Sequence, residues 1–95
     1  MKIVVSEMRA AANLLFDHLE SNGCSEIEVD TDYYWNVPSE KLYLVYEEPT
    51  ELTVGQISED LLNVKAVVEG RSPPVAYVFV WLASIIRFVG HRVVS

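Results

Sequence analysis

Acidic side chains alternate with apolar ones early in this sequence, at a spacing that would gather carboxylates on one face of a strand. The acidic members are Glu26, Glu28, Asp30 and Asp32, and the apolar ones between them are Ile27 and Val29. Side chains two residues apart in a strand point the same way, about 7 Å from each other. Such a row of carboxylates could bind a divalent metal, supply an acid–base pair, or attract a cationic protein.

The first two interpretations have little support. Carboxylates along a straight strand diverge, whereas a calcium-binding loop folds back on itself and usually contains a glycine, which is absent between Cys24 and Pro49. A nucleophile needs a positioned base, yet no spacing links Cys24 to His18 or His91. We therefore expect no catalytic residue, no metal site and no cofactor, and the sequence predicts a protein that is not an enzyme.

The overall charge favours a cationic protein as the partner. The 95 residues carry a formal net charge of −7, and Lys41 is the only Lys or Arg between Asp17 and Asp60. This balance argues against direct binding to DNA or RNA, which needs clustered bases. Cys24 has no other cysteine to pair with, and no apolar run reaches the roughly 20 residues that cross a bilayer. We expect a cytoplasmic protein without a membrane segment, monomeric or weakly dimeric when free.

Aromatic residues follow the acidic row directly. If the strand continues through Tyr33, Tyr34 and Trp35, alternation places Tyr33 and Trp35 on the apolar face with Ile27 and Val29. Tyr34 then shares the acidic face, where a rigid ring surrounded by carboxylates would anchor a basic partner. For Trp35, core packing is favoured over an interface role, which stays the alternative.

Tyr46, Glu47 and Glu48 repeat the combination of ring and acid nearby, although the end of a solvated hairpin would look the same. The predicted partner-binding residues are Glu28, Asp30, Asp32, Tyr34, Tyr46, Glu47 and Glu48.

Hydrophobic periodicity predicts a single α+β domain over residues 1–95. The first expected element is a helix over 7–21, capped by Ser6 and stopped by Gly23. Strands over 26–32 and 41–46 follow and form a small antiparallel sheet. Two helices complete the chain: one opens with a Thr53/Gln56 capping box and stops at Gly70, and the other runs over 75–89 and stops at Gly90. The last helix is apolar nearly all round, so we expect it to be central and buried.

Several segments together resemble a group of small bacterial proteins, some of which are similar to the immunity proteins of contact-dependent growth inhibition. The segments are Phe16-Asp17-His18-Leu19-Glu20, Ile27-Glu28-Val29-Asp30, Asp32-Tyr33-Tyr34-Trp35-Asn36-Val37-Pro38, Tyr46-Glu47-Glu48-Pro49 and residues 52–60. The resemblance covers most of the chain. It implies a protein that binds and neutralises the C-terminal domain of a cognate toxin, often a basic nuclease.

Under that interpretation the acidic residues would dock on or near the cationic active site of the toxin and block substrate entry by steric and electrostatic means. Two alternatives stay open. The chain could be an acidic regulatory or structural subunit that self-associates through an apolar patch including Trp81 or Phe88. A divalent-metal-dependent enzyme is the other.

Overall fold

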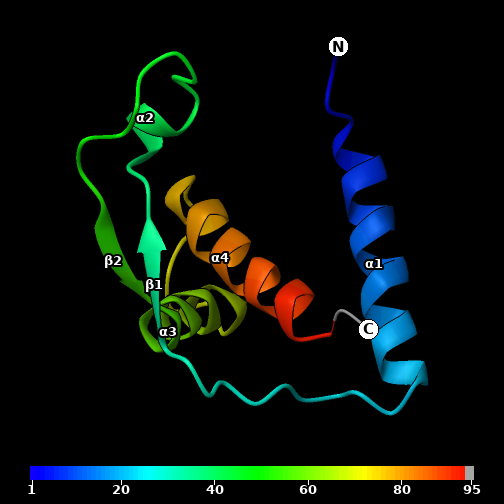
Figure 1. Cartoon of the computed structure of the whole chain (residues 1–95). Coiled ribbons are helices and arrows are strands. Elements are labelled where there is room, and N and C mark those ends of the chain that lie inside the picture. The colour runs from blue at the N-terminus through cyan, green and yellow to red at the C-terminus, as the bar shows by residue number, and fades with distance from the viewer. Residues whose placement is uncertain (94–95) are drawn as a thin grey trace.

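The N-terminal helix stands apart from the rest of the chain. The computed structural model describes residues 1–93, and in it α1 (Val5–Ser21) projects away from a body made of the other elements (Figure 1). The helix begins two residues earlier than predicted, because the Val4 carbonyl accepts hydrogen bonds from the amides of Glu7 and Met8. Ser6 therefore lies inside the helix and is not its cap.

The end of α1 is as predicted. Gly23 has a φ of +82°, the left-handed conformation that glycine adopts most easily. The amide of Gly23 donates to the Glu20 carbonyl at 3.0 Å, and that of Cys24 donates to the Leu19 carbonyl at 2.9 Å. These two bonds make a Schellman motif, which stops the helix and turns the chain sideways.

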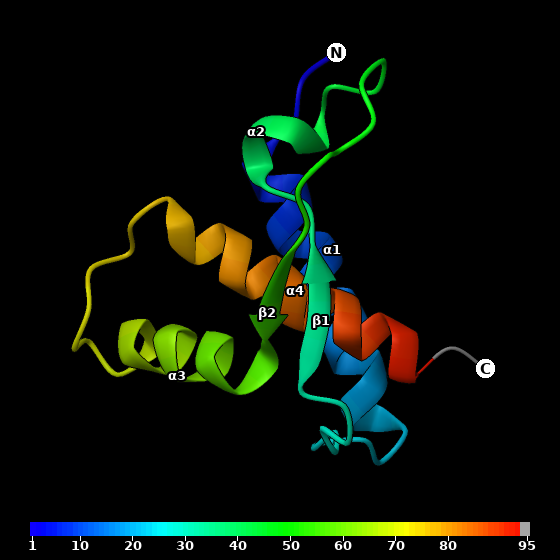
Figure 2. The same cartoon turned by 60° about the vertical axis from the view of Figure 1, so that its left-hand side comes forward.

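The strand predicted over 26–32 is wrong. Residues 24–32 run across the base of the molecule as an extended segment that pairs with no strand of the described chain (Figures 1 and 2). Alternation of acidic and apolar side chains suits any extended chain with one wet side, so the pattern did not by itself imply a sheet partner.

The sheet forms later in the chain and between different partners. It has two antiparallel strands, β1 (Tyr33–Asn36) and β2 (Thr53–Gln56), with Tyr34 opposite Gly55 and Trp35 opposite Val54. The strand predicted over 41–46 is wrong, because the short helix α2 (Ser39–Leu42) and turns occupy that region. The capping box predicted at Thr53 is also wrong, since Thr53 lies in β2 and its Oγ1 bonds the Asn36 side chain and carbonyl.

Two helices complete the body. α3 (Ile57–Val68) ends just before Gly70, whose φ of +75° confirms the predicted stop, and α4 (Tyr77–Arg92) packs against it. Gly90 does not end the last helix, which continues through it to Arg92. The order of helix, antiparallel sheet and two C-terminal helices confirms the α+β class.

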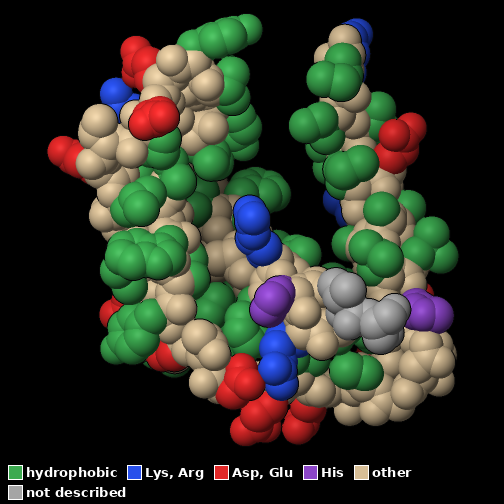
Figure 3. All heavy atoms as spheres, in the orientation of Figure 1, with side chains coloured by type: hydrophobic (Ala, Val, Ile, Leu, Met, Phe, Trp, Pro, Cys, Tyr) green, Lys and Arg blue, Asp and Glu red, His purple; other side chains and the backbone are tan. Residues whose placement is uncertain are grey.

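The core is very small. Within residues 1–93 only Ile57, 3% exposed, and Asp60, 6% exposed, are buried. The expectation of a buried last helix is therefore wrong, since none of the residues of α4, all of them described, is fully buried. Figure 3 shows the consequence, a wide hollow between α1 and the body with apolar side chains on both of its walls.

Candidate protein-binding surface

Tyr34 points toward the helices and not toward solvent. Its hydroxyl donates to Asp60 Oδ2 on α3 at 2.7 Å, and Ser84 Oγ on α4 donates to the same oxygen at 2.5 Å. Burial, and then the hydrogen bond to Asp60, raise the pKa of Tyr34 above its ordinary value of 10.0. The predicted placement of Tyr34 on the outward acidic face is wrong, because its hydroxyl bonds α3 and ties β1 to the helix pair.

Gly55 makes room for that ring. A Cβ at this position would overlap the Cζ, Oη and Cε1 atoms of Tyr34, which is the cross-strand neighbour of Gly55. The pairing therefore sets which face of the ribbon turns inward. Tyr34 fills the space over Gly55, so the residues on either side of it must point outward.

The outward face of β1 is aromatic. Tyr33 is 65% exposed and Trp35 is 74% exposed, and Trp35 lies beside Val54, which is also exposed. The alternation predicted for these residues is correct, but their faces are reversed, so Trp35 is a surface residue. We call Tyr33, Trp35 and Val54 the aromatic face.

Asp32 precedes β1 in the chain, yet its carboxylate binds the first residues of α3. Its Oδ1 accepts from the Ser58 amide at 2.7 Å, while its Oδ2 accepts from Ser58 Oγ at 2.7 Å and from Gln56 Nε2 at 2.9 Å. Hydrogen bonds from Gln56 and then from Ser58 lower the pKa of Asp32 below its ordinary value of 3.8. Asp32 acts as the N-terminal cap of α3, because the residue at the N-cap position of that helix makes no capping hydrogen bond with its own side chain. These bonds occupy both of its oxygens.

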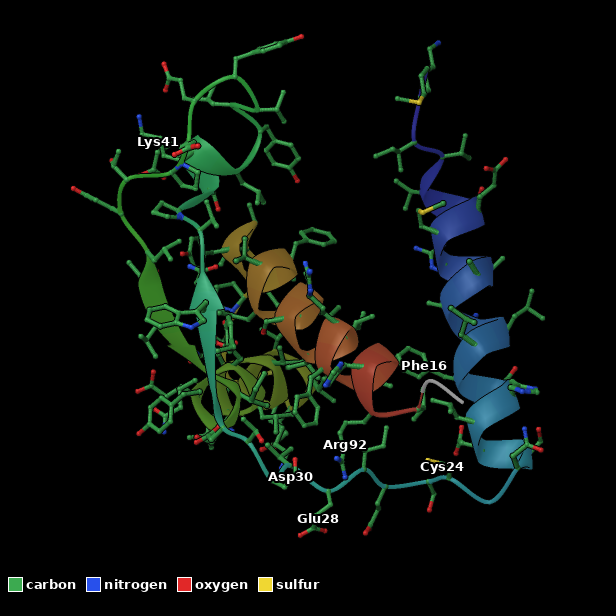
Figure 4. All side chains as sticks on the ribbon, in the orientation of Figure 1. Phe16, Cys24, Glu28, Asp30, Lys41 and Arg92 are labelled. Carbon is green, nitrogen blue, oxygen red and sulfur yellow. The ribbon has the colours of Figure 1, made fainter. Side chains whose placement is uncertain are left out.

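Three exposed carboxylates remain along the extended segment. We call Glu26, Glu28 and Asp30 the acidic edge, and Figure 4 shows Glu28 and Asp30 at the base of the molecule. Asp30 pairs with Arg92 of α4 at 3.1 Å, with both side chains about half exposed. Glu26 and Glu28 form no ion pair within the described part of the chain. Figure 3 shows acidic side chains gathered at this base.

A shallow pocket lies between the end of the extended segment, the start of β1 and α4. It encloses about 270 Å³, and its walls include Asp30, Tyr33, Phe88, His91 and Arg92. A second cavity of about 360 Å³ lies between the last turn of α1 and the helix pair, lined by Phe16 and Leu19 on one side and by Ile85 and Val89 on the other. A side chain from a partner could enter either of them.

The other predicted binding residues lie elsewhere. Lys41 lies on α2, at the end of the ribbon opposite to Glu28 and Asp30 (Figure 4), and Glu47 pairs with Lys41 at 3.7 Å. Tyr46 and Glu48 belong to the same exposed loop. The fold thus brings Glu28 and Asp30 together, directs Asp32 and Tyr34 into its own contacts, and leaves Tyr46, Glu47 and Glu48 at the far end.

Across residues 1–93 no group of three or more His, Cys, Asp or Glu side chains is placed to hold a metal ion. Cys24 directly follows the turn after α1 and is half-buried. None of the described helices is both long and apolar enough to cross a membrane.

Tyr33 and Trp35 are the functional candidates that reasoning from the sequence assigned to the core. A signal for them existed in Gly55, because a glycine within a strand often marks the close approach of another group. Its use requires the pairing of residues 33–36 with residues 53–56, which is a long-range property. Comparisons with protein-family models, with curated proteins and with solved structures found no match to this chain.

Proposed function

We propose that this chain is a binding protein that neutralises a basic partner protein, of the kind exemplified by toxin-immunity pairs. Its binding surface is the aromatic face together with the acidic edge. The partner presents an apolar or aromatic side chain to Trp35 and cationic side chains to Glu26, Glu28 and Asp30. Inhibition is steric, because the bound protein covers the surface with which the partner grips its own substrate.

The observation that carries this proposal is the exposure of Tyr33 and Trp35 on a paired strand. Aromatic residues dominate the energy of binding interfaces because they bury a large area with few rotatable bonds. The cross-strand bonds hold both rings in place before binding, which limits the entropy lost on association. Neither ring fills the small core, so both are available to contact a partner protein.

Charge adds selectivity and speed. With a net charge of −7 and carboxylates beside the rings, the surface attracts a basic protein and repels an acidic one. The Asp30–Arg92 pair is compatible with this role. Exposed ion pairs contribute about 0–1 kcal/mol, so an arginine of the partner can replace Arg92 with little loss.

The direct test is a growth experiment in which this chain is co-expressed with its candidate partner, a basic nuclease toxin domain. The wild-type chain restores growth, and Trp35→Ala abolishes protection. Purified Trp35→Ala binds the toxin domain about 2 kcal/mol or more weakly in calorimetry, with unchanged circular dichroism. Val45→Ala is the control, since Val45 is equally exposed in the distant loop.

Charge is tested separately. The double substitution Glu26→Gln and Glu28→Gln slows association at low salt and flattens its dependence on ionic strength, while dissociation changes little. Glu40→Gln with Glu51→Gln is the charge-matched control away from the acidic edge. Equal association rates for both double variants, or full binding by Trp35→Ala, would refute this surface.

A further inference from the structure

The molecule exposes far more surface than a folded monomer of its size. Its accessible area is 8272 Å², whereas a monomer of 10.7 kDa exposes about 5,500 Å². Its radius of gyration is 15.0 Å, against about 12.4 Å for a compact chain of this length. The excess area is roughly 2,800 Å² per chain.

Two apolar stripes lie on the helices beside the hollow. On α1 the stripe comprises Met8, Ala12, Leu15 and Leu19, which recur at helical spacing. On α4 the residues that lean on α3 alternate with an exposed stripe on the opposite side of the helix, made of Phe79, Leu82 and Ile86. Exposed stripes of this length mark surfaces that another chain covers.

The charges of the two helices complement each other. Glu7, Asp17 and Glu20 outnumber Arg9, so α1 carries a formal charge of 1 − 3 = −2. α4 has Arg87 and Arg92 and no acidic residue along its described length, a formal charge of +2 in which Arg92 is paired with Asp30 of its own chain. An α1 helix placed along an α4 helix therefore gains electrostatic attraction as well as apolar burial.

The α1 helix does not lie on the α4 of its own chain, and the extended segment explains why. Asp32 is fixed to the start of α3, Asp30 is paired with Arg92, and Ile27 lines the cavity beside the helix pair. These contacts hold the segment across the base of the body and direct α1 outward (Figure 1). The stripe of α4 is left open for an α1 from a different molecule.

We propose that two copies of this chain form a two-fold symmetric dimer in which α1 of each copy lies in the hollow of the other, with its apolar stripe on the Phe79, Leu82 and Ile86 stripe of α4. Such an interface is isologous, because each copy contributes both surfaces once. If half of the excess area is buried on each copy, the interface totals about 2,800 Å², within the range of obligate homodimers.

The test is the mass of the free protein by sedimentation and light scattering. Wild-type protein at micromolar concentration has twice the chain mass of 10.7 kDa. Leu15→Glu, in the α1 stripe, weakens dimerisation at least about thirty-fold by burying an unpaired carboxylate. Leu14→Glu is the matched control, because Leu14 is similarly exposed (72% against 66%) but lies about 130° around the helix from the centre of the stripe.

A second measurement covers the case in which the Leu15→Glu monomer does not stay folded. The melting temperature of the wild-type protein rises with protein concentration if the dimer is the folded unit, and is independent of it for a monomer. A wild-type monomer with a radius of gyration near 12 Å by X-ray scattering would show that α1 closes on its own body, which overturns the proposal. Equal masses for Leu14→Glu and Leu15→Glu would overturn it as well.

This dimer is independent of the proposed binding function. The aromatic face lies on the side of the ribbon away from Tyr34 and the helices, so Trp35→Ala leaves the mass of the free protein unchanged. Conversely, a toxin domain that binds normally to Leu15→Glu would leave the proposed function intact whatever the state of the dimer. The two failures are thus distinguishable.

Discussion

The hydroxyl of Tyr34 donates to Asp60 Oδ2 across 2.7 Å and thereby ties the ribbon to the helix pair. Ser84 donates to the same oxygen, so β1, α3 and α4 converge on one buried carboxylate. Ser84 Oγ also lies 2.7 Å from the Trp81 carbonyl of its own helix. With Ile57 as the other buried side chain, this polar junction accounts for a large share of what fixes the tertiary structure.

Removal of the Tyr34 hydroxyl should destabilise the protein without unfolding the ribbon. Tyr34→Phe keeps the ring over Gly55 but leaves Asp60 with one donor fewer. We expect the free energy of unfolding in urea to fall by about 1–2 kcal/mol. Tyr33→Phe is the control, because Tyr33 points to solvent, and it should change stability by less than about 0.5 kcal/mol. Equal effects of the two substitutions would contradict the junction.

The same tyrosine should make the protein sensitive to alkali. Its pKa is raised in the folded state, so the folded chain holds the phenolic proton more tightly than the unfolded chain does. The resulting stability is fully present below pH 10.0, the ordinary value, and is lost as pH rises through the folded-state pKa. Urea midpoints measured on both sides of that value should fall for the wild-type protein and fall less steeply for Tyr34→Phe.

A methyl group at position 55 should have a disproportionate effect. Gly55→Ala places a Cβ against the Tyr34 ring and displaces it from Asp60, and we expect a loss of about 1–3 kcal/mol in unfolding free energy. Gly90→Ala is the contrasting variant. Position 90 belongs to α4, and a Cβ added there would meet no described atom within 4 Å. This substitution should stabilise the protein by roughly 0.5–1 kcal/mol because alanine favours helix. A neutral Gly55→Ala would show that the ring lies elsewhere.

Asp32 should govern stability at the acid end. Its pKa is lowered by hydrogen bonds to the charged carboxylate, so its contribution is present above the ordinary value of 3.8 and disappears as pH falls through the folded-state pKa. Asp32→Asn should lower the urea midpoint at neutral pH and flatten its decline below about pH 4. Glu28→Gln, a carboxylate of the same segment outside this cap, should leave the pH profile unchanged.

Local signals in the sequence predicted the three long helices and two of their ends, although they missed α2 and misplaced several other helix ends. The apolar spacing of α1 and the glycines at 23 and 70 depend on residues within a few positions of each other, and these predictions held. The strands failed because pairing joins Asn36 to Thr53, which lie 17 residues apart. The Thr53/Gln56 pattern looks like a helix cap locally, whereas the actual cap of α3 comes from Asp32.

The candidate surface was predictable in composition and not in placement. Alternation correctly separated Tyr34 from Tyr33 and Trp35. The inner face of β1 was predicted by continuing the alternation of Ile27 and Val29 through residues 31 and 32. The chain turns at those residues before β1 begins (Figure 1). Parity holds only within one continuous strand, so the assignment of the two faces was reversed.

Because α1 is attached through a single extended segment, its hydrogen bonds should open locally and more often than those of the other helices. An isolated helix of 17 residues is marginally stable in water, and α1 receives little support from the body to which it is tethered. In the monomeric Leu15→Glu variant, backbone amides of α1 should exchange with deuterium through local fraying, long before those of α3 and α4, which require disruption of the junction at Asp60. Slow exchange in α1 of the wild-type protein would then report the protection that a second copy provides.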